Sequence, residues 1–408
     1  MAPGPSNRSP QPSGAAALRN ADRPLTVLQV LPRLDLGGVE RGAVEIARAV
    51  LAAGGRAMIA SAGGRLGPRL MGMGAEFVEG PFASKNPLTI WANAGRLARV
   101  VADEGVDVIH ARSRAPAWSA LMAARRTRTP FVTTWHGVYG DRGFLKRPYN
   151  AVMAKGRPTI AISQFIADHI AARCDLPPDQ LVIIPRGADV AVFSEDAVGA
   201  ERAIALARAW SLIEAPEPVV MLPGRLSRWK GQEDFIAAAA KLKAKRGPDF
   251  LFLIVGEDGG SGLAGRLFRQ AQSLGVLDVV RFGGRCDDMA AAYKLASVVV
   301  SASTAPEAFG RVAVEAQAMG RPIIATDHGG ARETVEHGRT GWLYPPGDVA
   351  ALAEAVDAAL SLDASARAHM GMAGRARVAS RFTVSAMQRA TLAVYEQAAG
   401  RSFGATLG

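Results

Sequence analysis

The chain has 408 residues and a formal net charge of +11, long enough for two domains of ordinary size. Its two cysteines, Cys174 and Cys286, form no disulfide or metal-binding pattern, and its six scattered histidines offer no zinc spacing. No stretch approaches the roughly 20 apolar residues that cross a bilayer. The composition therefore disfavours a disulfide scaffold, a zinc protein and a membrane-spanning protein, and a reducing cytoplasm is the expected compartment.

A tail and a first buried strand are predicted at the start of the chain. Residues 1–22, rich in Pro, Ser, Gly and Ala, are expected to be a disordered tail that lacks the apolar segment of a secretory signal. Residues 25–31 predict a buried strand, followed by a helix that ends near residue 53. Gly37 and Gly38 stand where this helix begins, so a ligand could closely approach unhindered backbone amides. A plain tight turn is the alternative.

No dinucleotide-binding fingerprint of the form Gly-x-Gly-x-x-Gly accompanies these two glycines, which counts against an NAD enzyme. Two further strands of the first half end near histidines. Residues 106–110 end at His110, with Arg112 two positions later, and residues 131–135 lead into His136. A histidine at a strand end either contacts a ligand or serves as a structural donor. Short apolar runs alternate with Ala-rich helical stretches, which indicates parallel sheets covered by helices.

The charge of the chain is divided unevenly. Residues 1–190 hold 24 Lys and Arg against 14 Asp and Glu, whereas the remaining residues hold 24 against 23. Basic and apolar residues mix at 125–128 and 142–149, which suits a surface that rests on anionic lipid headgroups. No nucleic-acid motif accompanies the basic residues, so nucleic acid is not the expected partner. A generally Arg-rich composition with no partner is the other interpretation.

In the second half, Arg225 and Lys230 lie five residues apart in the loop after the apolar strand at 218–222. From the carboxyl end of a strand both side chains can turn over one anionic ligand, because Arg offers a planar fork and Lys a compact charge. Together they can neutralise a diphosphate leaving group without a metal. An isolated pair with this spacing would be an ordinary solvated loop.

Two carboxylates follow the next predicted strand, at 296–300. Glu307 lies in the loop after this strand, and Glu315 lies inside a helix predicted over about 311–319. They cannot both cap that helix, so its first amides, near Phe309 and Gly310, stay available for an anion. One carboxylate for sugar hydroxyls, amides for phosphate and a second carboxylate for ribose are the groups that a nucleotide sugar needs. Two glutamates eight residues apart also occur by chance.

The combination of Arg225-x4-Lys230 and Glu307-x7-Glu315 resembles the nucleotide-sugar domain of retaining family 4 glycosyltransferases of the GT-B fold. Other segments are similar to the family as well. They are 255–259 with Gly256, 280–284 with Arg281, 328–333 and 338–348. The resemblance extends from residue 25 to about residue 400, and the combination is far more specific than any one segment.

The resemblance implies an α/β fold with two Rossmann-like domains, parallel sheets flanked by helices, that face a central cleft. The expected organisation is a tail at 1–22, an N-terminal acceptor domain at 23–190, a linker at 191–217, a nucleotide-sugar domain at 218–380, and a C-terminal helix at 381–400 that crosses back to the first domain.

The resemblance also implies roles for individual residues. Arg225 and Lys230 would stabilise the departing diphosphate, Glu307 would orient the sugar, and Glu315 would hold the ribose. His136 would contact the transferred sugar. The residues expected to complete the substrate contacts are Gly37, Gly38, Gly256, Arg281, Phe309 and Gly310.

The acceptor side departs from the family pattern at one place. Relatives often have His-x-His where this chain has His110-x-Arg112, which makes an acceptor with negative charge more plausible. Retention in the family is explained by front-face attack, in which the leaving phosphate helps take the acceptor proton. No metal and no cofactor are expected.

Segments 109–118 and 133–139 look like a bacterial subgroup that acts on lipopolysaccharide core. This resemblance implies transfer of a hexose, mannose in the first instance, from GDP-mannose or a UDP-hexose to a lipid-linked envelope glycan. The enzyme would then lie on the inner face of the cytoplasmic membrane.

Two other classes stay open. A GT-B sugar-nucleotide epimerase would need an acid and a base around the sugar, and the Arg225, Lys230 and Glu315 set favours transfer instead. A non-catalytic subunit that binds nucleotide sugar or glycan would be expected to have lost part of the site.

Overall fold

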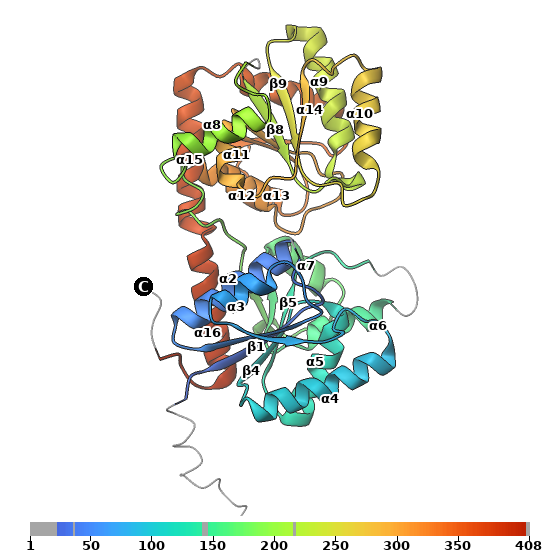
Figure 1. The fold of residues 1–408 in the computed structure, drawn as a ribbon, viewed down its shortest axis with the longest axis vertical. Coiled ribbons are helices and arrows are strands. Elements are labelled where there is room, and N and C mark those ends of the chain that lie inside the picture. Colours follow the sequence, from blue (N-terminus) through green and yellow to red (C-terminus); the bar gives the residue numbers. More distant parts are fainter. Residues whose placement is uncertain (1–22, 36, 141–145, 215–217, 405–408) are drawn as a thin grey trace, which may run out of the picture. The chain divides into compact units, whose positions relative to one another are not determined.

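A computed structural model of the chain describes residues 23–35, 37–140, 146–214 and 218–404 (Figure 1). The predicted tail, the end of the predicted linker and part of the basic segment at 142–149 lie outside the described residues. Two compact units are present. One holds the residues up to Thr133, Lys155–Arg157 and the residues from Leu392 on, and the other holds Thr134–Ala154 and Pro158–Thr391.

The first sheet has seven strands in the order β3-β2-β1-β4-β5-β6-β7. Its strands and helices are β1 (Thr26–Val30), α2 (Gly38–Ala52), β2 (Arg56–Ser61), α3 (Gly67–Gly72), β3 (Glu76–Glu79), α4 (Pro87–Asp103), β4 (Val108–Ala111), α5 (Arg114–Thr127), β5 (Phe131–Trp135), α6 (Lys146–Asn150), β6 (Thr159–Ala161), α7 (Gln164–Ala171) and β7 (Leu181–Ile183). Strand β1 pairs in parallel with β2 and with β4, so the strand order reverses between β1 and β4.

The second sheet has six strands in the order β10-β9-β8-β11-β12-β13. Its strands and helices are α8 (Ala200–Ala209), β8 (Val219–Pro223), α9 (Gln232–Arg246), β9 (Leu251–Val255), α10 (Leu263–Ser273), β10 (Val280–Gly284), α11 (Met289–Leu295), β11 (Val298–Ser301), α12 (Arg311–Ala318), β12 (Ile323–Thr326), α13 (Ala331–Thr334), β13 (Gly341–Tyr344), α14 (Val349–Leu360) and α15 (Ala364–Arg381). All its pairs are parallel, and here the order reverses between β8 and β11. The predicted pair of Rossmann-like parallel sheets is confirmed.

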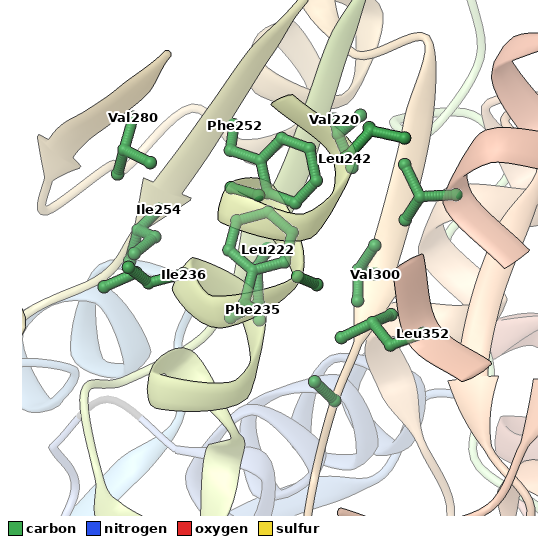
Figure 2. Packing of buried hydrophobic residues seen from close by; sticks show 14 of the residues in the cluster. Val220, Leu222, Phe235, Ile236, Leu242, Phe252, Ile254, Val280, Val300 and Leu352 are labelled. Atoms are coloured by element: carbon green, nitrogen blue, oxygen red, sulfur yellow. The ribbon is translucent and has the colours of Figure 1, made fainter. Parts of the chain in front are cut away.

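Strands β8 and β9 are buried along their whole length, as expected of strands covered by helices on both faces. The side chains of Leu222 and Phe252 pack against Phe235 of α9 on one face of the sheet (Figure 2). The ring centroids of Phe235 and Phe252 are 4.5 Å apart. This core fixes where β8 ends, and therefore where the loop that carries Arg225 begins.

The predicted linker at 191–217 is corrected by the structure. Helix α8 lies inside it, and Val198, Ala203, Ala207 and Trp210 are buried in the core of the second sheet. The indole Nε1 of Trp210 donates to the carbonyl oxygen of Gly283 at 2.9 Å. Residues 198–212 are therefore part of the second domain. Ala203 and Ala207 of α8 lie on one face of the helix, and this face packs into that core.

The C-terminal helix α16 (Val384–Ala399) follows α15 after a two-residue break. Its Tyr395 is buried, and the tyrosine oxygen lies 2.5 Å from Nδ1 of His110 in β4. The last helix thereby supplies a side chain to the core that surrounds the first sheet. Among the described residues, no helix is both long enough and apolar enough to cross a bilayer.

The Phe252 packing gives a stability prediction. Phe252→Ala should lower the free energy of unfolding by about 3–5 kcal/mol, because it removes a fully buried ring and leaves a cavity. Urea unfolding would measure the change. Met372→Ala, at an exposed position of α15, should change the value by no more than about 0.5 kcal/mol. Equal effects of the two substitutions would contradict the packing described.

Candidate functional site

The predicted donor residues lie where the strand order of the second sheet reverses. Strand β8 leads into the loop of Arg225 and Lys230, and its neighbour β11 leads into the loop of Glu307. In open parallel sheets ligands bind outside the carboxyl ends of the strands at this kind of reversal. The fold therefore brings the two predicted loops to the position where a ligand is expected.

Lys230 and Glu307 form an ion pair there. The ammonium Nζ of Lys230 donates to Oε1 of Glu307 at 2.7 Å, and the side chains are only 17% and 15% exposed. The sequence predicted both residues but not their contact. Arg225, at the start of the same loop, is exposed.

Two serines complete the surroundings of Glu307. The hydroxyl of Ser303 donates to Oε1 at 2.5 Å, and that of Ser301 at 3.3 Å. Burial opposes ionisation of Glu307, but the charge of Lys230 and the hydrogen bonds from Lys230, Ser303 and Ser301 together outweigh it and lower the pKa of the carboxyl. Glu307 is therefore a carboxylate at neutral pH and can accept hydrogen bonds from hydroxyl groups.

Trp229 is a further residue of this edge that sequence reasoning missed. The Lys230 ammonium lies 4.5 Å from the centre of the indole ring, a cation–π distance. The backbone carbonyl of Trp229 accepts from the amide of Thr304 at 2.8 Å, which ties the Lys230 loop to the Glu307 loop. The sequence indicated a role for Trp229 only through its position next to Lys230, a residue predicted to bind an anion.

Gly256 is required by a close approach between two loops. A Cβ atom at this position would lie 1.9 Å from the carbonyl oxygen of Gly224. The Gly224 amide donates to Val255 O at 2.8 Å, and the Leu226 amide donates to Glu257 O at 3.0 Å. These bonds hold Arg225 beside the loop that follows β9.

A cavity of about 830 Å³ opens beside that loop. Predicted residues Gly256 and Arg281 both line it. The other lining residues are Leu226, Ile254, Glu257, Asp258, Ala264, Gly265, Phe268, Leu277, Val280, Phe282, Gly284 and Arg285. Its wall is largely apolar and carries two aromatic rings, Phe268 and Phe282, whose centroids are 6.3 Å apart. Such a wall with a few charged groups suits a planar heterocycle better than a free sugar.

The remaining predicted donor residues lie on or before α12. Glu315 is 5% exposed, and its Oε2 accepts a hydrogen bond from the Tyr293 hydroxyl at 3.0 Å. Phe309 is buried, with its ring centroid 5.7 Å from that of Phe382. Gly310 adopts a left-handed backbone with φ +88° just before the first helical residue. Phe309 can therefore offer a ligand only its backbone.

In the first domain, Gly37 and Gly38 lie at the start of α2, as predicted. A Cβ atom at Gly37 would lie 2.3 Å from a carboxylate oxygen of Glu40, whereas a Cβ atom at Gly38 would meet nothing within 4 Å. The fold itself therefore does not require glycine at position 38. Close approach of a ligand is one reason to have it there.

His110 and Arg112 are corrected as residues of the acceptor surface. Their exposed fractions are 0% and 1%, and Nε of Arg112 donates to Oε1 of Gln29 at 2.6 Å. Burial lowers the pKa of Arg112, an effect that Tyr395 and Glu45 partly offset. Both side chains are built into the core of the first sheet, so they have no accessible atom with which to contact an acceptor.

His136 lies directly after β5 and is partly exposed. Nη2 of the buried Arg186 lies 2.8 Å from its Nδ1. The same Nη2 lies 3.3 Å from Nε2, and because a guanidinium only donates, a ring nitrogen of His136 accepts from it. The structure thereby orients His136 through Arg186, which the sequence did not predict.

No group of three or more His, Cys, Asp or Glu side chains that could hold a metal ion occurs in the described part of the chain. Glu307, the carboxylate nearest to the predicted diphosphate site, is paired with a lysine instead.

Taken together, two Rossmann-like parallel sheets define an α/β protein whose second sheet carries the Lys230–Glu307 pair at a position where open parallel sheets bind ligands. Residues 206–377 match the model of the Glycosyl transferases group 1, and residues 36–192 match that of Glycosyltransferase Family 4. The D-inositol 3-phosphate glycosyltransferase of Streptomyces bingchenggensis is 32% identical over 72% of this chain and 67% of its own length. The chain belongs to the group 1 glycosyltransferases with a family 4 type of N-terminal domain.

A second relative with the same name, from Corynebacterium kroppenstedtii, is 33% identical over 57% of this chain, and the match spans about half (51%) of that relative. A glycosyltransferase structure from Rickettsia africae is 33% identical, with a TM-score of 0.84 over 92% of this chain and 98% of its own. Anabaena HepE, solved with UDP and glucose, is 24% identical, with a TM-score of 0.79 over 91% of this chain and 100% of its own, and shares the fold.

These comparisons confirm the GT-B fold and the glycosyltransferase family. The two relatives above are named for inositol 3-phosphate and not for lipopolysaccharide core, so they do not support the finer resemblance to core mannosyltransferases.

The close approach at Gly256 gives a prediction for the site. Gly256→Ala should displace the Gly224 loop and lower the turnover of a nucleotide-sugar donor about a hundredfold, because misplacement of a binding group by about 1 Å has effects of this size. Nucleotide release would measure turnover. Gly199→Ala is the matched control, since a Cβ atom there meets nothing within 4 Å. Unchanged turnover in Gly256→Ala would show that this loop does not position the donor.

The Lys230–Glu307 pair gives a pH prediction. The folded-state pKa of Glu307 is below its ordinary 4.5, so ionised Glu307 stabilises the fold at neutral pH, and this contribution is lost as the pH falls through the lowered value. Glu307→Gln should therefore lower the free energy of unfolding by about 2 kcal/mol near neutral pH, with a smaller difference below about pH 4.

Urea unfolding at the two pH values would measure this difference. Glu354→Gln, at an exposed position of α14, is the control and should change stability by less than about 0.5 kcal/mol at either pH. A difference for Glu307→Gln that grows on acidification would contradict the assigned direction.

Proposed function

We propose that this chain transfers a hexosyl group from a nucleoside diphosphate sugar to an anionic acceptor, with retention at the anomeric carbon and without a metal. The observation that carries the proposal is the Lys230–Glu307 pair, which lies at the carboxyl ends of β8 and β11 in the domain that holds the apolar cavity.

Each part of the donor, namely the base, the ribose and the diphosphate, can be assigned to the residues whose chemistry suits it. The apolar cavity with Phe268 and Phe282 accommodates the base. Glu315, the fifth residue of α12, accepts hydrogen bonds from the ribose. Arg225, Lys230 and the amides at Gly310 bind the diphosphate. The Anabaena structures with UDP and UDP-glucose support a nucleotide-sugar donor, although their identity to this chain is only 23–24%.

The reaction breaks the bond between the anomeric carbon and the diphosphate oxygen. The electron pair leaves with the diphosphate, and Arg225 and Lys230 stabilise the negative charge that develops on it. The acceptor hydroxyl oxygen forms the new bond, and its proton goes to the departing phosphate. Glu307 accepts hydrogen bonds from the hydroxyls of the sugar, and His136 contacts the transferred sugar.

The ion pair sets a requirement for donor binding. Lys230 is already bonded to Glu307, so a diphosphate that approaches must share the ammonium with this carboxylate. An ammonium group has three N–H donors. One of them bonds Glu307, so Lys230 can also donate to a diphosphate oxygen. Glu307 also keeps Lys230 charged and oriented before the donor arrives.

For the acceptor, two anionic compounds are supported by different observations. The net positive charge of the first half and the lipopolysaccharide-core resemblance favour mannose transfer from GDP-mannose to a lipid-linked glycan on the inner face of the cytoplasmic membrane. The 32% identity to an inositol 3-phosphate glycosyltransferase favours a soluble inositol phosphate. Since each acceptor carries phosphate, a basic acceptor domain suits both. Both hypotheses share the donor site.

A donor panel with loop variants tests the proposal. Arg225→Ala and Lys230→Ala should each lower turnover about 10²–10³-fold, because each removes a cation that stabilises the leaving group. Thermal stabilisation by UDP-, GDP- and ADP-sugars would show which nucleotide binds, since a ligand of the folded state raises its stability. Nucleotide release would report turnover with each acceptor.

Arg228→Ala is the matched control, because Arg228 is an exposed arginine of the same loop. It should keep turnover within about tenfold of the unmodified protein. Arg225→Ala is the cleaner of the two test variants, because Arg225 is exposed and Lys230→Ala also leaves Glu307 without its cation. Near-normal turnover in both variants, or no response to any nucleotide sugar, would refute the donor site.

A further inference from the structure

Helix α4 of the first domain presents an apolar face to solvent. Leu88 is 78% exposed and Trp91 is 64% exposed, and Ala92 beside them is exposed as well. Residues 86–95 contain no charged side chain although much of this stretch is at the surface. Large apolar side chains grouped at the surface mark a contact with a partner or a membrane.

Folding does not account for this face. The opposite side of α4 is buried through Asn93, Ala94, Leu97 and Val101. The Asn93 amide also donates to Pro81 O at 3.0 Å, and the Ser119 hydroxyl of α5 donates to Ile90 O at 2.9 Å. The helix is thus anchored by its inner side, and Leu88 and Trp91 contribute little to the core.

Basic residues surround the apolar face. Arg126 of α5 lies over the indole ring of Trp91 at 5.8 Å from its centre. Lys85 before the helix, Arg96 and Arg99 along it, and Arg125 of α5 are all exposed. The first acidic residue of α4 is Asp103, at its end. Helices α4 and α5 pack against each other (Figure 1), and Arg126 brings a cation of α5 to the apolar face through its contact with Trp91.

We propose that this α4 face, formed by Leu88, Trp91 and Ala92 with Lys85, Arg99 and Arg126, binds the surface of an anionic phospholipid membrane. A tryptophan and a leucine ringed by arginines suit the boundary between headgroups and acyl chains, because the indole prefers that depth and the cations reach lipid phosphates. Charge complementarity favours this occupant over a neutral apolar partner.

The proposal concerns binding and does not rest on the identity of the donor. Because the inner side of α4 is buried through Ala94, Leu97 and Val101, only its outer face is available to contact a membrane surface. A membrane at this face would place the first domain where lipid-linked acceptors are found, whereas a soluble acceptor would make no use of it.

Sedimentation with lipid vesicles tests the proposal on the full chain. The protein should bind vesicles that contain phosphatidylglycerol, bind pure phosphatidylcholine vesicles much more weakly, and be released by salt. Replacement of both apolar residues, Leu88→Ser with Trp91→Ser, should weaken binding at least about tenfold. Arg99→Gln should weaken it about fivefold, the effect of one cation near an anionic surface.

The matched control replaces two exposed apolar residues of the second domain, Ile204→Ser with Met372→Ser, at 44% and 54% exposure. It should bind vesicles like the unmodified protein. Vesicles of brominated phosphatidylglycerol should quench the Trp91 fluorescence of the unmodified protein. The Trp91 contribution is the difference in emission between the unmodified protein and Trp91→Phe. Nucleotide release by the Leu88 and Trp91 double variant with donor alone should be unchanged, which shows that the variant is folded.

Absence of binding to phosphatidylglycerol vesicles would overturn the proposal, as would a double variant that binds like the unmodified protein. A concentration-dependent dimer that the double variant abolishes, without vesicle binding, would assign the α4 face to a second copy of the chain and equally overturn it. If the protein binds vesicles but is neither stabilised by nor active on any nucleotide sugar, this proposal is upheld and the donor site is refuted.

Discussion

The donor edge depends on one interaction, the ion pair between Lys230 and Glu307. Both groups are largely removed from water, and either one without the other would leave an uncompensated charge at low exposure. Their meeting is possible because parallel strands end at the same edge of a sheet, and β8 and β11 are neighbours although 74 residues lie between the end of β8 at Pro223 and the start of β11 at Val298. The strand order reverses at this position, where ligands bind in open parallel sheets, and the ion pair links the two loops there.

Much of this edge could be predicted from the sequence, because the relevant signals are local. Apolar runs fix the strand ends, and Arg225, Lys230 and Glu307 follow those ends directly. The hydroxyls of Ser301 and Ser303 and the ring of Trp229 were missed, because strand position alone does not determine which way a side chain turns. The packing of the loops sets the direction in which the two serine side chains turn toward Glu307. The close approach of Gly256 to Gly224 sets the position of the loop that carries Arg225.

The errors in the first domain have the opposite origin, since they come from contacts between distant parts of the chain. His110 and Arg112 occupy a strand end, where a ligand residue is expected, yet Tyr395 from the last helix reaches His110 across 285 residues. The two residues predicted to bind an acceptor, His110 and Arg112, are therefore buried polar residues of the core. In the same way, α8 looks like a linker until Trp210 is seen to bond Gly283. No local pattern contains such information.

The distribution of charge now has a physical interpretation. In the second domain many basic side chains are paired with acids, as Arg202 is with Asp288, Arg246 with Asp357 and Lys230 with Glu307, in keeping with its nearly balanced composition. On α4 and α5, by contrast, cations gather around an apolar surface that the fold does not need. A charge excess useful only for solubility would be spread over the surface and would not surround a tryptophan. An anionic membrane surface, as proposed, would complement both the charge and the apolar groups of this face.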